Sequence, residues 1–254
     1  MKNWIDERQN KLREFFEFDS QTELIPCQIV EQFSLSPNAA EHLEKHNIEW
    51  HVIPSSAVSI DTDDYRARFY PKLKFDAASR DYQKTSSYRA IMSGHQRHQG
   101  RIIGVETTIK PKYLPGNRQF YGTPYGFEPR ADPFAPYFGA ARMMSGTRYA
   151  HNYRSLRNLV NSITEDWTKR GLMPPGYRLT ICPPVAFNLV GTIFHPEWSE
   201  TESLELGFYR DENNNAKCYA VGSNAPGDFS YIHEIETESD WALLGFRTAL
   251  VPET

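Results

Sequence analysis

The stretch YRLTICPPVAFNLVGTIF, residues 177–194, sets the expected fold class, because it begins a region of short apolar runs separated by turns. Runs of this length predict strands, and their regular spacing is typical of an antiparallel sandwich or barrel. The predicted strands are Tyr177–Cys182, Ala186–Phe194, Ser203–Tyr209, Ala216–Val221, Phe229–Ile235 and Ala242–Leu250.

Helical patterns surround this β-rich region. Residues 3–17 and 151–170 each carry apolar side chains at helical spacing, which predicts two amphipathic helices. Ser36 is a candidate N-cap for a further helix, and residues 48–53 alternate like a strand. We therefore expect an α+β fold, in which an antiparallel β-barrel or sandwich is flanked by N-terminal and central helices.

The chain is expected to form a single domain, residues 1–254. It divides into a helical N-terminal part (1–60), a basic, loop-rich part (61–150) and a part with a helix and the strands (151–254). Five prolines between Tyr113 and Tyr137 argue against a continuous helix or a central strand there. A loop of this length usually lines a site or covers a core, and we expect it to act as a lid.

Composition points to a soluble protein of the cytoplasm. The sequence holds no apolar run long enough to cross a membrane, and its charged first residues do not resemble a signal peptide. Its 3 cysteines form no paired motif, so a zinc knuckle or a disulfide scaffold is not expected. Glycine-rich phosphate-binding loops and the hydrolase nucleophile motif are absent as well.

Charge is segregated along the chain. Residues 1–63 carry 5 Lys/Arg and 12 Asp/Glu, residues 64–180 carry 20 and 8, and residues 181–254 carry 3 and 12. The basic middle is rich in arginine and aromatic residues, which suits anionic or planar partners. The default interpretation is that this segment folds onto the acidic ends of its own chain. Nucleic-acid binding and a role as an assembly interface, including a homo-oligomeric one, are the alternatives.

One constellation near the C-terminus suggests catalysis. His195 and Glu197 are two residues apart and would point to the same side of a strand, and His233 follows on a later predicted strand. Two imidazoles and one carboxylate are the ligand set of non-haem Fe(II) sites. Arg247 lies on the last predicted strand, where it could bind a carboxylate through both arms of its guanidinium.

In these residues the region resembles the double-stranded β-helix superfamily of cupins and Fe(II)/2-oxoglutarate oxygenases. The oxygenases carry a His-x-Asp/Glu pair, a distal His and then an Arg, an order that His195, Glu197, His233 and Arg247 match. The resemblance implies that the first three residues hold Fe(II) and that Arg247 anchors 2-oxoglutarate. It covers roughly residues 177–250, and the acid is Glu where the family usually has Asp.

A second resemblance concerns the tail. The run LGFRTAL, residues 244–250, is similar to the Gly-Phe-Arg end of C-type-lectin-like folds such as the formylglycine-generating enzyme, although the paired catalytic cysteines of that enzyme are missing. This likeness implies a binding or structural module. The first expectation is thus an Fe(II)-dependent oxygenase of a small anionic substrate, with 2-oxoglutarate as cosubstrate. The alternative is a non-enzymatic binding or assembly protein, of viral structural type, that uses the Arg- and aromatic-rich segment as its interface.

Overall fold

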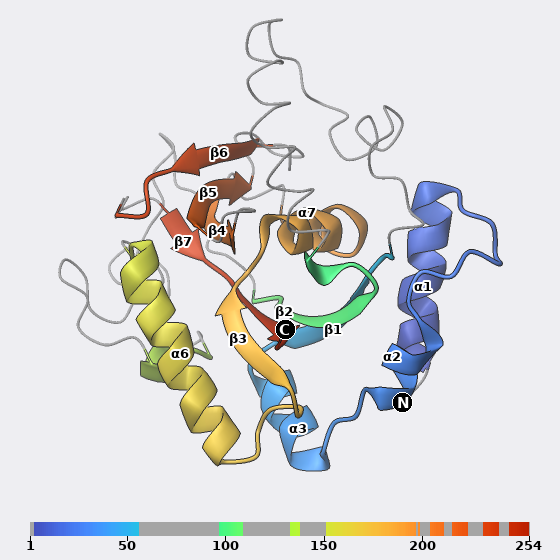
Figure 1. Cartoon of the computed structure of the whole chain (residues 1–254), viewed down its shortest axis with the longest axis horizontal. Helices are drawn as coiled ribbons and strands as arrows, with labels where there is room; N and C mark the ends of the chain where they lie inside the picture. Colours follow the sequence, from blue (N-terminus) through green and yellow to red (C-terminus); the bar gives the residue numbers. More distant parts are fainter. Residues whose placement is uncertain are drawn as a thin grey trace, which may run out of the picture.

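The computed structural model describes residues 3–55, 97–108, 133–137, 151–196, 198, 204–210, 215–222, 231–238 and 244–253, and they form two four-stranded sheets with helices packed on both sides (Figure 1). The helical elements are α1 (Asn3–Phe16), α2 (Cys27–Gln32), α3 (Pro37–Lys45), the short 3₁₀ helix η2 (Ala135–Tyr137), α6 (Tyr153–Lys169) and α7 (Pro184–Ile193). The strands are β1 (Ile48–Ile53), β2 (Arg101–Glu106), β3 (Tyr177–Ile181), β4 (Leu204–Arg210), β5 (Ala216–Gly222), β6 (Tyr231–Ile235), β7 (Leu244–Phe246) and β8 (Thr248–Pro252).

The first sheet has the strand order β1-β2-β8-β3 and is antiparallel throughout. Its strands come from both ends of the chain, so residues 48–53 lie in the same sheet as residues 248–252. Gly104 on β2 permits the close approach of neighbouring strands, because a Cβ there would lie 2.8 Å from the side chain of Ile48. The first sheet therefore joins the N-terminal strand to the β-rich C-terminal part.

The second sheet has the order β6-β5-β4-β7, with antiparallel pairs except for β4 and β7, which are parallel. β7 and β8 follow each other directly, and the chain passes from the second sheet into the first at Arg247. Neither sheet closes on itself in the described part of the chain. The α+β class with antiparallel sheets is thus confirmed, while a closed barrel is not found among these residues.

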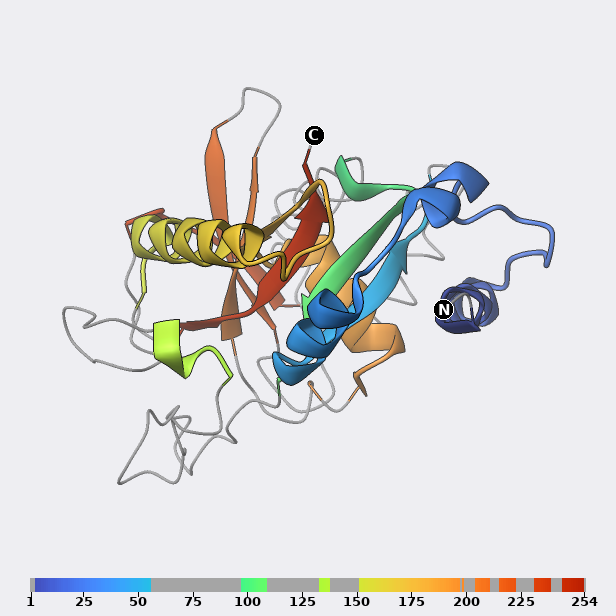
Figure 2. The same cartoon turned by 90° about the horizontal axis from the view of Figure 1, so that it is seen from below.

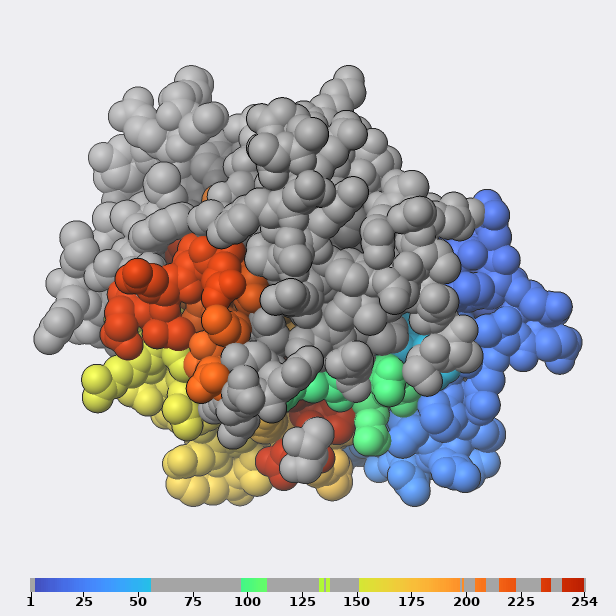
Figure 3. All heavy atoms as spheres, turned by 45° about the horizontal axis from the view of Figure 1, so that its top comes forward, coloured from blue at the N-terminus to red at the C-terminus, as the bar shows by residue number. Residues whose placement is uncertain are grey.

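Two hydrophobic cores lie on either side of these strands. One contains residues of α1, β1, β2 and α7, and the other contains residues of α3, α6, β3 and the second sheet. β8 contributes to both because its side chains alternate: Ala249 and Val251 face the first core and Leu250 faces the second. Figure 2 shows α6 lying beside β3, and Figure 3 shows α6 and the N-terminal helices on opposite sides of the molecule.

Most predicted elements are found where the sequence placed them. The helices predicted at 3–17 and 151–170 correspond to α1 and α6. Ser36 caps α3 as expected, since its side-chain oxygen accepts a hydrogen bond from the backbone N–H of Ala39 at 3.1 Å. β1 and the strands at 177–182, 203–209, 216–221 and 229–235 are confirmed within one or two residues at each end.

The strand predicted at 186–194 is wrong, because this segment is the helix α7. A continuous apolar run cannot distinguish a buried strand from a buried helix by its periodicity. Pro184 occupies the first turn of α7, where its missing N–H costs no helical hydrogen bond. The helix contacts β4 and β5 of one sheet and β2 of the other, which explains why it is apolar all round.

Within the basic part of the chain, residues 61–150, the structure describes residues 97–108 and 133–137. The predicted lid at 113–137 lies outside the described residues except for 133–137, which pack against α6: Trp167 donates a hydrogen bond to the hydroxyl of Tyr137 at 2.8 Å, and Phe134 is buried. No helix in the described ranges has the length and apolar character needed to cross a membrane.

Candidate metal centre

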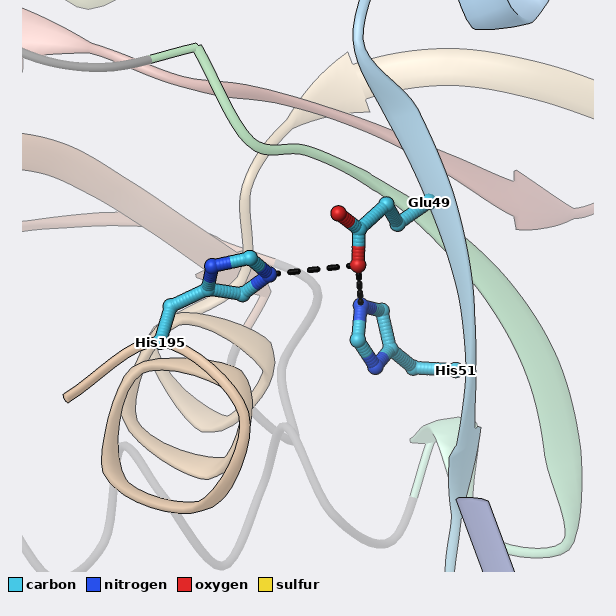
Figure 4. A group of neighbouring side chains, drawn as sticks. All are labelled: Glu49, His51 and His195. Atoms are coloured by element: carbon cyan, nitrogen blue, oxygen red, sulfur yellow. Dashed lines mark hydrogen bonds and ion pairs between the residues drawn. The ribbon is translucent and has the colours of Figure 1, made fainter. Parts of the chain in front are cut away.

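Strand β1 places Glu49 and His51 on the same face, because they are two residues apart. His195 reaches them from the end of α7, where its backbone N–H donates to the carbonyl of Val190 at 2.9 Å and its own carbonyl accepts from Trp198 at 3.0 Å. Figure 4 shows the two imidazoles converging on the Glu49 carboxylate. The three side chains thus come together although residues 49 and 195 are far apart in the sequence.

The distances are close to those of a metal ligand set. Oε2 of Glu49 lies 3.1 Å from Nε2 of His195 and 3.7 Å from Nε2 of His51, and one ligand atom from each residue lies within 4.8 Å of the other two. Metal bonds of about 2.0–2.2 Å in a tetrahedral site put the ligand atoms roughly 3.3–3.6 Å apart. The Glu49 pairs are therefore near ligand spacing, and a small approach of the imidazoles would complete the site.

His51 is the most unusual member of the group. Its side chain is fully buried, and neither ring nitrogen makes a hydrogen bond to a residue in the described part of the chain. Burying a polar group without a partner is costly, so such groups are rare in folded proteins. A metal bound at Nε2 would satisfy one of the two nitrogens.

The electrostatics favour the protonation states that metal ligands need. The hydrogen bond from His195, aided by the charge of Arg8, lowers the pKa of Glu49 to about 2, although partial burial opposes this shift. Burial, together with the charge of Arg8, lowers the pKa of His51 well below its ordinary value. At neutral pH Glu49 is therefore a carboxylate and His51 is a neutral imidazole, as metal binding requires.

Neighbouring side chains hold these groups in place. Arg8 on α1 forms an ion pair with Oε2 of Glu49 at 3.0 Å. The ring of Trp198 stacks on His195 with the centroids 5.0 Å apart, and the guanidinium carbon of Arg247 lies 3.9 Å from the centroid of the Trp198 ring. The His195 ring is thus supported on one side by a stack that continues to the junction of the two sheets.

One residue that the sequence proposed as a metal ligand, His195, lies in this group. Glu197 and the side chain of His233 lie outside the described residues. The backbone of His233 is on β6 of the second sheet, opposite Ala220. The prediction that these two residues complete the ligand set with His195 stays untested.

Arg247 occupies a different environment from the one expected for a substrate anchor. Its side chain is 1% exposed, and its guanidinium donates to the Glu205 carboxylate at 3.1 Å and to the backbone carbonyls of Glu106 and Thr108. These partners belong to both sheets and to the segment after β2. A substrate carboxylate would have to displace Glu205 to reach the guanidinium.

Glu49 and His51 were missed by the sequence analysis, although the signal was present. Residues 48–53 were predicted as a strand, and the Glu-x-His spacing within it places both side chains on one face, as the same reasoning assumed for His195 and Glu197.

The fold and the three side chains define this chain as an α+β protein with a candidate centre of two histidines and one carboxylate. No family model, curated protein or solved structure matches the chain. Its function therefore has to be inferred from the three side chains and their surroundings.

Proposed function

We propose that Glu49, His51 and His195 bind one divalent metal ion and that the protein is a non-haem Fe(II)-dependent oxygenase. The observation that carries this proposal is the fully buried His51, whose ring nitrogens lack hydrogen bonds within the described residues, beside an ionised carboxylate and a second imidazole. Two imidazoles and a carboxylate leave positions open for substrate and oxygen, which is the chemistry that a bound Fe(II) would supply. The same donors also bind Zn²⁺, so the metal itself has to be identified.

The surroundings of the centre support a small anionic substrate. Arg8 and Lys11 on α1 both approach the ring of Phe194, with their charged groups 4.8 Å and 5.6 Å from its centroid. Arg8 also reaches Glu49, so positive charge lies next to the proposed ligands. In this proposal Arg8 and Lys11 attract the substrate or the carboxylates of 2-oxoglutarate, whereas Arg247 stays bonded to Glu205.

A double-stranded β-helix is the specific fold that would accompany an oxygenase of this type, and the structure has features for and against it. Two four-stranded, largely antiparallel sheets support it. The parallel pair β4–β7 and the position of Glu49 and His51 on the N-terminal strand β1 favour another arrangement. The metal proposal depends on the three side chains and not on the name of the fold.

Metal analysis of the purified full chain tests the proposal directly. We expect close to one equivalent of Fe or Zn per chain after anaerobic reconstitution, and loss of most of it in the variants Glu49→Gln, His51→Gln and His195→Gln. His46→Gln is the matched control, since His46 lies among Phe134, Tyr137 and Trp167 rather than in the cluster. Full metal content in all three cluster variants would refute the site.

A second experiment separates the two candidate ligand sets and the activity. If Glu197 and His233 complete the site, their Gln variants lose metal while Glu49→Gln keeps it; our proposal predicts the opposite. With Fe(II) loaded, we expect one O₂ to be consumed for each 2-oxoglutarate converted to succinate and CO₂; one oxygen atom enters succinate, and the second enters the substrate or, without substrate, is reduced to water by added ascorbate. A chain that binds Fe(II) but consumes no O₂ with any oxo acid contradicts the oxygenase assignment and leaves only the metal site. A chain that takes up no metal favours the binding or assembly alternative.

A further inference from the structure

A second candidate site lies at the opposite edge of the first sheet from the metal centre. A pocket of about 310 Å³ is formed by residues of α6, β3, the end of β8, β4 and the segment at 97–98. β1 and β3 are the two edge strands of the sheet, with β2 and β8 between them. Strands about 4.8 Å apart put roughly 14 Å between the edges, so the pocket is separate from Glu49, His51 and His195.

The pocket is lined by positive charge. Arg97, Arg157 and Arg178 all line it, and no acidic residue is among the described residues that do. Arg157 and Arg178 are exposed, and neither forms an ion pair within the described part of the chain. By contrast, Arg170 at the C-cap of α6 is paired with Asp166 at 3.0 Å. The guanidinium groups of Arg157 and Arg178 are therefore available to an anionic ligand. Each guanidinium can bind two oxygens of a phosphate or a carboxylate through two parallel N–H donors.

The backbone of β3 adds polar character to the same edge. The N–H of Leu179 donates to the hydroxyl of Thr164 on α6 at 3.1 Å, so it points away from β8. Alternation along an antiparallel strand turns the N–H of Ile181, two residues further on, to the same side. Both residues line the pocket. A main-chain donor is thus available near the arginines.

Part of the remaining wall is apolar, beside the polar side chains of His98, Asn161 and Thr180. Phe208 on β4 lines the pocket and stacks on Tyr153 with the ring centroids 4.6 Å apart. Val160 and Val251 complete this side. A bare inorganic ion would leave these surfaces unused, whereas an organic group attached to the anion would cover them. The volume is at the small end of the range for ligand pockets, which limits the organic part to a single ring or a short chain.

We propose that this pocket binds a small organic phosphate, with the phosphate held by Arg157 and Arg178 and the organic part packed against Phe208 and Val160. α6 and β3, which supply the two arginines, lie side by side in both views of the fold (Figures 1 and 2). The proposal is independent of the metal centre.

Calorimetric titration of the full chain with phenyl phosphate is the test, at low ionic strength and with a chelator present so that a metal cannot hold the phosphate. We expect saturable binding at about tenfold higher affinity than for inorganic phosphate, because the ring buries apolar surface. Arg157→Gln and Arg178→Gln should each weaken binding by at least about threefold, as expected for loss of one charge-assisted contact at an exposed site.

Arg154→Gln is the matched control, because it removes the same charge from an exposed position of α6 that does not line the pocket. The proposal is overturned if Arg154→Gln weakens binding as much as Arg157→Gln, or if phenyl phosphate binds no better than inorganic phosphate. Tighter binding of a single-stranded oligonucleotide, weakened equally by all three variants, would identify an extended nucleic-acid surface and would also overturn it. Unchanged thermal unfolding of the variants shows that they fold.

Discussion

Replacing Arg247 by Met should destabilise the protein far more than it affects any bound substrate. The guanidinium is 1% exposed and its partner, the carboxylate of Glu205, is 6% exposed. Removing one member of a buried ion pair leaves the other charge buried without compensation, which typically costs about 3–5 kcal/mol. The contact with the Trp198 ring would be lost as well, at about 0.5–2 kcal/mol. Since a domain is stable by only about 5–15 kcal/mol, this is a large fraction of the total.

Urea denaturation measures the effect, with the free energy of unfolding taken by linear extrapolation. Arg170→Met is the control, because the Arg170–Asp166 pair is exposed and should be worth less than about 1 kcal/mol. The double variant Glu205→Gln/Arg247→Met removes the stranded charge and should recover part of the loss. It should not recover all of it, because the carbonyls of Glu106 and Thr108 would still lack their donor.

A cost of less than about 1 kcal/mol for Arg247→Met, the value expected for an exposed pair, would refute the buried ion pair. If the same variant then raises the KM for an oxo acid, the guanidinium is a substrate anchor, as the sequence suggested. A coupling energy near zero between Glu205 and Arg247 would refute the ion pair in the same way.

Three further changes test other parts of the structure. Trp198→Leu removes the ring stacked on His195 and should lower metal affinity about tenfold in a chelator competition, since outer partners orient metal ligands; an unchanged affinity would remove Trp198 from the site. Gly104→Ala would place a Cβ 2.8 Å from the Ile48 side chain and should cost about 1–3 kcal/mol in the same urea assay, so a neutral result would contradict the tight strand contact. Burial lowers the pKa of His42 from 6.5 to about 4, so the unfolded chain binds the extra proton between these values and stability should fall as the pH drops from 6.5 toward 4. Because His42 is only partly buried, the slope should stay below the roughly 1.4 kcal/mol per pH unit of a fully buried group, and His42→Gln should remove it.

Local patterns predicted the elements well, but they did not predict the sheets. The capping of α3 by Ser36 and the apolar faces of α1 and α6 depend on residues close in sequence, so they could be predicted. The helix α7 could not, because an apolar run reports burial and not conformation. The order β1-β2-β8-β3 depends on pairings between distant segments, for which a single sequence gives no direct signal.

The candidate site likewise combines a local pattern, which the sequence showed, with contacts between distant segments, which it did not. The prediction of His195 as a ligand depends on Glu197 two residues away, which is a local sequence pattern. The observed partners of His195 come from β1 and are brought to it only by the packing of α7 against the sheet. The candidate group has the same composition as the predicted one, two imidazoles and a carboxylate, but two of its three members, Glu49 and His51, could only be found in the structure. The sequence placed Arg247 on a single last strand, residues 242–250, whereas the structure divides this segment into β7 and β8 and puts Arg247 between them. The sequence also could not indicate Glu205 as its partner.

Trp198 lies between His195 and Arg247, two residues that the sequence assigned to one catalytic constellation. One side of its ring stacks on His195 and the ring also contacts the guanidinium of Arg247, which in turn bonds to Glu205 on β4 and to the end of β2. The position of the proposed metal ligand is thus coupled to the residue at which the chain crosses between sheets. A rigid support of this kind is what a metal centre needs, because small displacements of a ligand change its affinity strongly. Arg247 can therefore matter to the proposed chemistry without touching a substrate, and its loss should lower metal affinity and stability together.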